Sequence, residues 1–285
     1  MCRHLAYVGP EEPLGRLLVA PPHGLHRQSW APRRQRYGTV NADGFGVGWY
    51  AAGDPVPARY RRAGPIWADQ SFADLARVVR TRALLAAVRD ATLAGPDAEA
   101  AAAPFAAGTW LFSHNGAVAG WPGSLSGSVR SLPAEDLLTL EARNDSAFVW
   151  ALVLNRLRAG HAEGRALADT VLEVASAAPA SRLNLLLTDG ATVAATAWGD
   201  TLWYLARPDG GTVVASEPYD DAPEWREVPD RTLLVASRAA VRLTPLRDAA
   251  PGAPPAAGDP PASSGPPAPA DPFVPVPAPA EEHRP

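Results

Sequence analysis

The stretch MCRHLAYVGP (residues 1–10) contains the only cysteine of the 285-residue chain, Cys2, directly after the first methionine. The segment HLAYVG (4–9) has the apolar, aromatic and small residues that are typical of a β-strand. A lone cysteine excludes an internal disulfide, and at the beginning of a first strand it adds little to a core. The position of Cys2 therefore points to a chemical role rather than to a packing role.

A cysteine at position 2 becomes the first residue of the chain once the methionine is removed, which aminopeptidases do when the second side chain is small. Cys2 then carries a thiol and a free α-amine. The α-amine titrates near pH 8, about two units below lysine, so a usable fraction is an unprotonated base at cellular pH. One residue can thus supply a nucleophile and its general base. On position alone, a chance occurrence of cysteine is the alternative.

The composition narrows the classes of function. The 26 basic residues, all arginine, and 30 acidic residues give a net charge of −4, which does not favour nucleic acid or an anionic membrane as a partner. No run approaches the roughly 18 apolar residues of a membrane span, and no signal peptide is apparent, so we expect a cytoplasmic protein. Zinc-finger spacings, GxGxxG and Walker motifs are missing from the sequence, and we expect no metal and no cofactor.

The composition changes sharply near residue 248. The segment 248–285 is rich in proline and alanine and is expected to be a disordered tail, while 2–247 are expected to form one domain.

Helical spacing predicts helices over 69–88 and 145–159, and LADTVLEVASAA (167–178) is expected to be a third helix. The second of these helices has Asn144 or Asp145 as its N-cap. One of its faces is apolar and consists of Phe148, Leu152, Val153 and Leu157. Strands are expected around 4–9 and 44–51 and in four segments after residue 181. Helices between antiparallel strands predict an α+β layered sandwich.

An acyl-transfer nucleophile needs hydrogen-bond donors for the developing oxyanion. FSHNG (112–116) offers the side-chain amide of Asn115 and the backbone N–H of Gly116 after an apolar run. Asn-Gly is also the commonest signal of a hairpin turn. Both interpretations stay open for this motif taken alone.

Two charged residues could hold the ends of a free amino acid. LAAVRDAT (85–92) places Arg89 beyond an apolar segment, and arginine binds carboxylates through two hydrogen bonds. NDSAF (144–148) provides Asp145, an acceptor for an ammonium group. A surface arginine and a helix N-cap are the plain alternatives.

Taken together, these segments resemble a known family. Cys2, NADGFGVGWY (41–50), AAVRDAT (86–92), FSHNG, NDS (144–146) and LNLLLTDG (183–190) occur in the order found in class II glutamine amidotransferases. These are N-terminal nucleophile hydrolases, and the resemblance covers about residues 2–245. It implies a four-layer αββα sandwich.

The resemblance also implies a role for each residue of the motifs. Cys2 resembles the nucleophile that forms a γ-glutamyl thioester, and Asn115 and Gly116 resemble the oxyanion hole. Arg89, with Thr92 nearby, resembles the ligand of the substrate's α-carboxylate. Asp145 resembles the acceptor of the α-ammonium. Many relatives have glutamate at the position of Ala147. If that glutamate helps to fix the loop, its loss makes the placement of Asp145 less secure in this chain, without affecting the nucleophile.

One branch of the family shares more of the sequence, especially the long stretch 21–50. These amidohydrolases remove glutamate from γ-glutamyl-hercynylcysteine S-oxide in ergothioneine biosynthesis. The resemblance implies the same hydrolysis here, with a small γ-glutamyl substrate as partner. The alternatives are a stand-alone glutaminase that supplies ammonia to a separate synthase and an inactive binding module of the same fold. The sequence leaves open whether the chain forms a homo-oligomer.

Several further residues are weaker candidates for the site. An aromatic cage for a quaternary ammonium group could use tryptophans, and the arginines at 33, 34 and 36 could meet a carboxylate or a sulfoxide; core packing and a solvated loop are the alternatives. We expect His114 to be a structural hydrogen-bonding residue. His4, two residues after Cys2, is expected to line the site and is a weaker candidate base. The tryptophans considered are Trp30, Trp49, Trp67 and Trp121.

Overall fold

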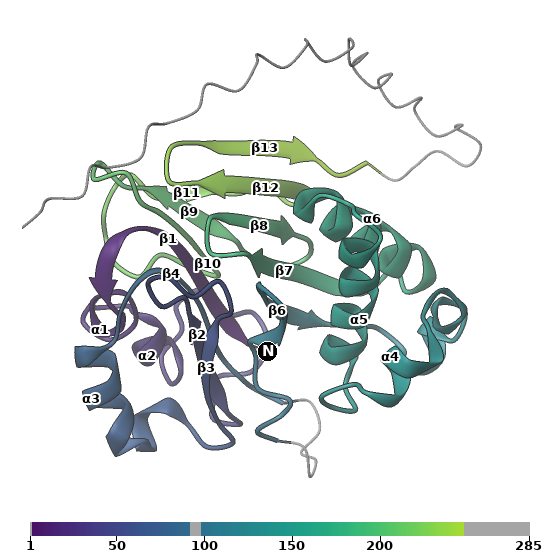
Figure 1. Ribbon diagram of the computed structural model, residues 1–285, viewed down its shortest axis with the longest axis horizontal. Helices are drawn as coiled ribbons and strands as arrows, with labels where there is room; N and C mark the ends of the chain where they lie inside the picture. The colour runs from purple at the N-terminus through teal and green to yellow at the C-terminus, as the bar shows by residue number, and fades with distance from the viewer. Residues whose placement is uncertain (1, 92–97, 248–285) are drawn as a thin grey trace, which may run out of the picture. The chain divides into compact units, whose positions relative to one another are not determined.

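The computed structural model describes residues 2–91 and 98–247. Within these residues the chain forms two antiparallel β-sheets with helices on both outer sides (Figure 1). The expected domain covers this part of the chain, whereas the predicted tail at 248–285 lies outside the described residues. Among the residues described, no helix is long and apolar enough to cross a membrane.

The first sheet has seven strands in the order β11-β9-β10-β1-β4-β2-β3. Its strand β1 pairs with β10 on one side and with β4 on the other, so the segment that begins at Cys2 runs through the middle of the sheet. The strands are β1 (Arg3–Pro13), β2 (Phe45–Trp49), β3 (Ala58–Arg62), β4 (Arg80–Val88), β9 (Trp203–Ala206), β10 (Thr212–Ala215) and β11 (Arg226–Glu227).

The second sheet has six strands in the order β13-β12-β8-β7-β6-β5. The strand β6, which contains the FSHNG motif, pairs with β7 along its length. The strands are β5 (Phe105–Ala107), β6 (Trp110–Ala117), β7 (Arg182–Thr188), β8 (Thr192–Ala197), β12 (Thr232–Ser237) and β13 (Val241–Pro245).

The residues of β1 show how the layers are built. Successive side chains of a strand point to opposite faces, and Leu5 and Tyr7 pack in the cluster under the helices of the first sheet. Ala6 and Val8 pack instead between the two sheets, in a cluster rich in alanine. Small side chains there allow the sheets to stack closely, and the result is the α-β-β-α order of four layers that the resemblance implies.

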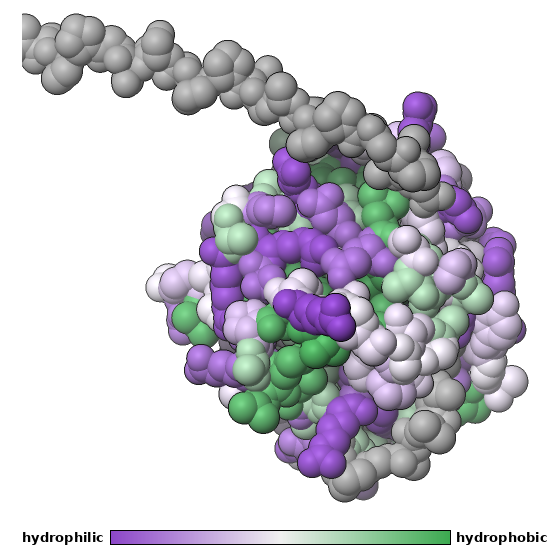
Figure 2. Space-filling view, turned by 90° about the vertical axis from the view of Figure 1, so that its right-hand side faces the viewer, coloured by the Kyte–Doolittle hydropathy of each residue, from purple (hydrophilic) through white to green (hydrophobic). Residues whose placement is uncertain are grey.

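The outer layers are two groups of helices. The helices α1 (Leu14–Leu18), α2 (Leu25–Gln28) and α3 (Gln70–Val78) cover the first sheet, and α5 (Asp145–Arg158) and α6 (Glu163–Ala177) cover the second, with α4 (Ala134–Leu138) beside α5. Viewed from the side of α4, α5 and α6, the surface shows apolar patches among polar side chains (Figure 2).

The second predicted helix is confirmed and matches α5. Asn144 is its N-cap, because its side-chain oxygen accepts the N–H of Ala147 at 2.8 Å. The predicted face of Phe148, Leu152, Val153 and Leu157 is buried in the core of the second sheet. The third predicted helix corresponds to α6, which begins four residues earlier than its motif.

The first helix prediction, over 69–88, is wrong in its second half. The helix α3 ends at Val78, and Arg80–Val88 form the strand β4. Leu84, Ala86 and Val88 face the helices while Ala83 and Leu85 face the other sheet. A strand buried on both faces is a continuous apolar run, which helical spacing fits equally well.

Candidate active site

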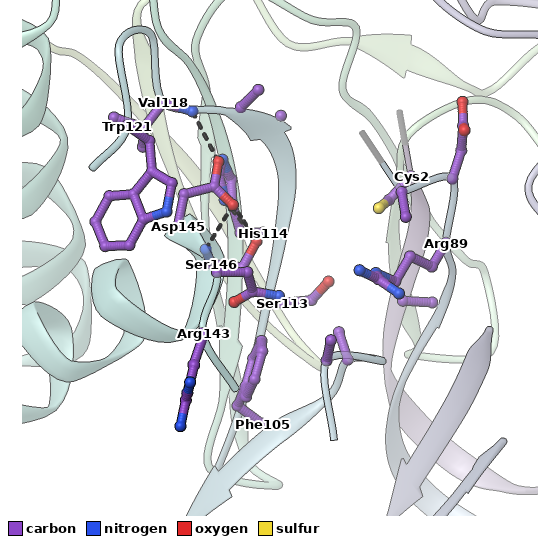
Figure 3. Close-up of a pocket in the computed structure, with 18 of the residues that line it drawn as sticks. Cys2, Arg89, Phe105, Ser113, His114, Val118, Trp121, Arg143, Asp145 and Ser146 are labelled. Carbon is purple, nitrogen blue, oxygen red and sulfur yellow. Dashed lines mark hydrogen bonds between the residues drawn. The ribbon is translucent and has the colours of Figure 1, made fainter. Parts of the chain in front are cut away.

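A cavity of about 310 Å³ opens where the beginning of β1 meets the end of β4, the strand β6 and the beginning of α5. Figure 3 shows Cys2 and Arg89 on one wall and His114, Asp145 and Ser146 on the opposite wall. Four of the predicted segments therefore meet at one place, although they are far apart in the sequence. The lining consists of Cys2, Ala87–Ala91, Ala101, Ala103, Phe105, Ser113, His114, Gly116–Val118, Gly120, Trp121 and Arg143–Ser146.

The thiol of Cys2 points into this cavity (Figure 3). The residue is partly buried and directly precedes β1. Burial raises the pKa of the thiol above its ordinary value, and the negative charge of Asp145 adds to this rise while Arg89 opposes it. The thiol is thus neutral at neutral pH, and a base must take its proton before it can act as a nucleophile.

Arg89 directly follows β4, and the NADG segment (41–44) fixes its position. The backbone of Arg89 exchanges hydrogen bonds with this segment, donating to the carbonyl of Gly44 at 2.8 Å and accepting the N–H of Asp43 at 2.9 Å. Its guanidinium Nη1 donates to the carbonyl of Asp43 at 3.1 Å. The Asp43 carboxylate accepts the N–H of Ala91 at 2.8 Å. The NADG motif therefore holds the segment that presents the arginine to the cavity.

The Asn-Gly pair is not a turn. Asn115 and Gly116 lie within β6, opposite Asn184 and Leu183 of β7. A Cβ atom on Gly116 would lie 1.9 Å from the carbonyl oxygen of Arg182. Glycine is therefore required here by the close approach of a neighbouring strand, and the hairpin interpretation is wrong.

The two predicted oxyanion residues differ in their exposure to the cavity. Gly116 belongs to its lining, whereas the side chain of Asn115 is fully buried behind it. The Asn115 amide nitrogen Nδ2 donates to the hydroxyl of Ser216 at 3.3 Å. Its oxygen Oδ1 has no hydrogen-bond partner among the described residues.

The carboxylate of Asp145 is fixed by two backbone N–H groups. Oδ2 accepts from Val118 at 2.8 Å and Oδ1 accepts from Ser146 at 2.8 Å. Ala147, where many relatives have glutamate, is buried in the core of α5. The residue that directly follows β6 and the first turn of the helix thus hold Asp145 without a glutamate.

His114 behaves as the structural residue that the sequence predicts. Its Nε2 donates to the carbonyl of Arg182 at 2.9 Å, since a carbonyl only accepts, and its Nδ1 lies 3.0 Å from the hydroxyl of Ser146. Both ring nitrogens are occupied by groups other than the thiol. The ring links β6 to the beginning of α5 and thereby supports Asp145.

The prediction that His4 lines the cavity is wrong. His4 is fully buried, and its Nδ1 is 3.2 Å from the hydroxyl of Ser113, which does line the cavity. Burial lowers its pKa well below the ordinary value, and the charges of Arg3 and His114 lower it further. The ring is therefore neutral and supports the cavity wall from behind.

Of the four candidate tryptophans only Trp121 lines the cavity; Trp30 and Trp67 contact each other, and Trp49 packs at the core of the first sheet. None of the three candidate arginines lines it. Arg33 pairs with Asp221 at 2.8 Å, and Arg34 lies over the ring of Trp203. Thr92 lies outside the described residues.

Several lining or supporting residues were not predicted from the sequence. Phe105 and Arg143 line the cavity but belong to no chemical motif. Ser113 stands inside FSHNG, and its neighbours in that motif could have indicated it. Asp43 stands in the NADG motif, but its role depends on a contact with a distant strand.

Comparison with known proteins agrees with this arrangement. The family model described as class II glutamine amidotransferases matches residues 24–210. A gamma-glutamyl-hercynylcysteine sulfoxide hydrolase of Mycolicibacterium smegmatis is 45% identical over 246 residues, covering 86% of this chain and 100% of that protein. The protein of the same name from Mycobacterium tuberculosis is 43% identical over 247 residues, covering 86% and 97%.

Solved structures share the fold at lower identity. A glutamine aminotransferase class-II domain protein from Silicibacter pomeroyi superposes with a TM-score of 0.61 and 24% identity, covering 86% of this chain and 99% of that one. Glutamine phosphoribosylpyrophosphate amidotransferase from B. subtilis gives 0.58 with 16% identity, over 86% of this chain and 49% of its own. On the family match and the identity to these relatives, the chain belongs to the class II glutamine amidotransferases.

Proposed function

We propose that this protein hydrolyses the γ-glutamyl amide of γ-glutamyl-hercynylcysteine S-oxide, a step of ergothioneine biosynthesis, through a γ-glutamyl thioester on Cys2. The observation that carries the proposal is that the thiol of Cys2 and two residues of opposite charge, Arg89 and Asp145, line the same cavity. The relatives that are 43–45% identical to this chain bear the name of this hydrolase.

The charges of the cavity suit a γ-linked glutamyl group. Such a group has a free α-carboxylate and a free α-ammonium at one end and the reactive carbonyl at the other. The guanidinium of Arg89 would bind the carboxylate, with Thr92 as a further proposed contact, and Asp145 would accept from the ammonium. An arginine and an aspartate on facing walls (Figure 3) thus select an amino acid with both charged groups free.

Cys2 would attack the γ-carbonyl once Met1 has been removed. Because burial raises the pKa of its thiol, the proton must pass to a base, and the new α-amine is the base on the same residue. The thiolate sulfur then forms a bond to the γ-carbon, and the carbonyl oxygen becomes an oxyanion. The Asn115 amide and the Gly116 N–H would stabilise that charge, a contribution of about 3 kcal/mol per donor in well-studied hydrolases.

The tetrahedral intermediate would then break its carbon–nitrogen bond. The leaving group is the α-amine of hercynylcysteine S-oxide, which takes the proton held by the Cys2 amine and departs. Water attacks the remaining thioester, and glutamate is released while the sulfur recovers its proton. Each cycle consumes one water and regenerates the free thiol.

Glutamate release from the full-length protein tests the proposal. We expect γ-glutamyl-hercynylcysteine S-oxide to be hydrolysed, the Cys2→Ala variant to be inactive but still to bind the substrate, and free glutamine to be a poor substrate. Equal activity of the Cys2→Ala variant would overturn the nucleophile. Efficient hydrolysis of free glutamine would favour the glutaminase alternative, and the absence of turnover with both substrates would favour the binding module. The cytoplasmic location, the disordered tail and the oligomeric state stay predictions.

A further inference from the structure

Ser216 connects the nucleophile strand to the oxyanion strand. It directly follows β10 and is fully buried. Its hydroxyl oxygen accepts the backbone N–H of His4 in β1 at 3.0 Å and the side-chain N–H of Asn115 in β6 at 3.3 Å. One hydroxyl therefore touches both strands on which the proposed chemistry depends.

The layer between the two sheets, in which Val214 of β10 packs, is mostly apolar. Side chains that pack between the sheets include Ala6, Leu85, Leu186 and Val214. A buried amide or hydroxyl in such a layer is costly unless it is hydrogen-bonded. The hydrogen bond between the Asn115 amide and the Ser216 hydroxyl satisfies part of the hydrogen-bonding capacity of each side chain, so the two side chains are held together.

The backbone of Ser216 is fixed on several sides. Its N–H donates to the carbonyl of His4 at 3.0 Å, and its carbonyl accepts the hydroxyl of Thr201 at 2.8 Å. The carboxylate of the next residue, Glu217, is fully buried and accepts the backbone N–H groups of Arg33 and Arg34 at 2.9 and 2.7 Å. A residue held this firmly can impose its own position on a neighbouring side chain.

The contact leaves the Asn115 amide with one hydrogen to donate. An amide nitrogen carries two hydrogens, and the hydroxyl of Ser216 takes one of them. We propose that Ser216 is a positioning residue that orients the Asn115 amide, so that its second N–H is held ready for the oxyanion of the proposed reaction. This inference rests on the proposed function, because it acts through the oxyanion role of Asn115.

The expected signature is a loss of kcat without a change in KM. Arg89 and Asp145 would bind the substrate, and neither contacts Ser216 through a hydrogen bond among the described residues. Ser216→Ala should lower kcat by about 3- to 10-fold, the range that the loss of one neutral hydrogen bond gives. Ser216→Thr keeps the hydroxyl and should restore most of the rate.

A double-mutant cycle on the full-length protein separates positioning from general structural damage. We expect Asn115→Ala to lower kcat by about 100-fold or more and the Ser216→Ala/Asn115→Ala double variant to be no slower than Asn115→Ala alone. Thr170→Val is the matched control, since it removes another fully buried hydroxyl, which donates to the carbonyl of Ala166 at 2.8 Å in α6, away from the cavity lining and from Ser216. It should lower the unfolding temperature as Ser216→Ala does, with kcat unchanged.

Three outcomes would overturn the inference: an unchanged kcat in Ser216→Ala, additive effects in the double variant, or an equal loss of kcat in Thr170→Val. If the proposed function itself is wrong, the experiments give other results. If the wild-type protein releases no glutamate, or if Cys2→Ala is as active as the wild type, the reaction itself is wrongly assigned. If Asn115→Ala keeps the full rate while Cys2→Ala is inactive, only the oxyanion assignment and the role of Ser216 fail.

Discussion

The Asp145→Asn variant removes the negative charge of the aspartate while it keeps nearly the same shape in the fold. The carboxylate accepts two backbone N–H groups, from Val118 to Oδ2 and from Ser146 to Oδ1, each at 2.8 Å. Asparagine has nearly the same shape but a single acceptor oxygen. The variant loses the negative charge that would meet the substrate's α-ammonium, and one of the two N–H groups then faces an amide NH₂.

The size of the effect follows from these contacts. A hydrogen bond to a charged group contributes about 1.5–3 kcal/mol, so kcat/KM should fall by roughly 10- to 150-fold. Because the ammonium stays in place throughout the reaction, the loss should appear mainly as a higher KM. The N–H group left without an acceptor should also lower the free energy of unfolding by about 1–3 kcal/mol.

Glutamate release over a range of substrate concentrations measures the first effect and chemical denaturation the second. Asp69→Asn is the matched control, because Asp69 also accepts two backbone N–H groups at a helix start, both through Oδ1, and lies outside the cavity. Its kcat/KM should equal that of the wild type.

A substrate analogue without the α-amino group gives the decisive comparison. The loss caused by Asp145→Asn should largely disappear with this analogue, because neither protein has an ammonium to bind and only the minor effect of the Asp145 charge on the pKa of the Cys2 thiol is left. A variant that loses as much activity on this analogue as on the full substrate would refute the assignment of Asp145, and so would an unchanged kcat/KM on the full substrate.

Three further predictions concern packing and protonation. Gly116→Ala places a Cβ atom 1.9 Å from the carbonyl oxygen of Arg182, so thermal unfolding should show a loss of about 1–3 kcal/mol or more; an unchanged stability would contradict this. Ala147→Glu puts an unpaired carboxylate into the buried face of α5 and should cost about 3 kcal/mol or more in chemical denaturation, whereas a gain in stability would show that a partner exists. Burial lowers the pKa of His4 in the folded state, so the unfolded state binds its proton first and stability should fall as the pH drops below about 6.5, by up to about 1.36 kcal/mol per unit. Replacing His4 with glutamine should flatten this dependence, and an equally steep curve would contradict the account.

The elements that the sequence predicts well are those whose pattern has one interpretation. The face of Phe148, Leu152, Val153 and Leu157 fits a helix and no strand, and the structure buries it as predicted. The helix prediction was wrong for Arg80–Val88, because a strand that is buried on both faces shows no alternation of polar and apolar residues. Local spacing cannot distinguish such a strand from a helix.

The candidate site shows the same limit. Motifs identified Cys2, Arg89, Gly116 and Asp145, and the structure places all four around one cavity. The predicted position of His4 was wrong because local spacing does not show that its ring is buried against Ser113 of the other sheet. Contacts between distant strands also explain why Ser216 gave no signal in the sequence: its hydroxyl has partners only once β1, β6 and β10 are assembled.

The central claim is that Cys2 forms a covalent γ-glutamyl intermediate. The most direct test is the intact mass of the full-length protein, rapidly quenched in acid during turnover of γ-glutamyl-hercynylcysteine S-oxide, followed by peptide mapping. The account predicts that Met1 is absent, that a fraction of the protein gains the mass of one glutamyl group, and that the first residue carries it. Turnover without any such adduct in the wild type, or with Met1 retained, would contradict it.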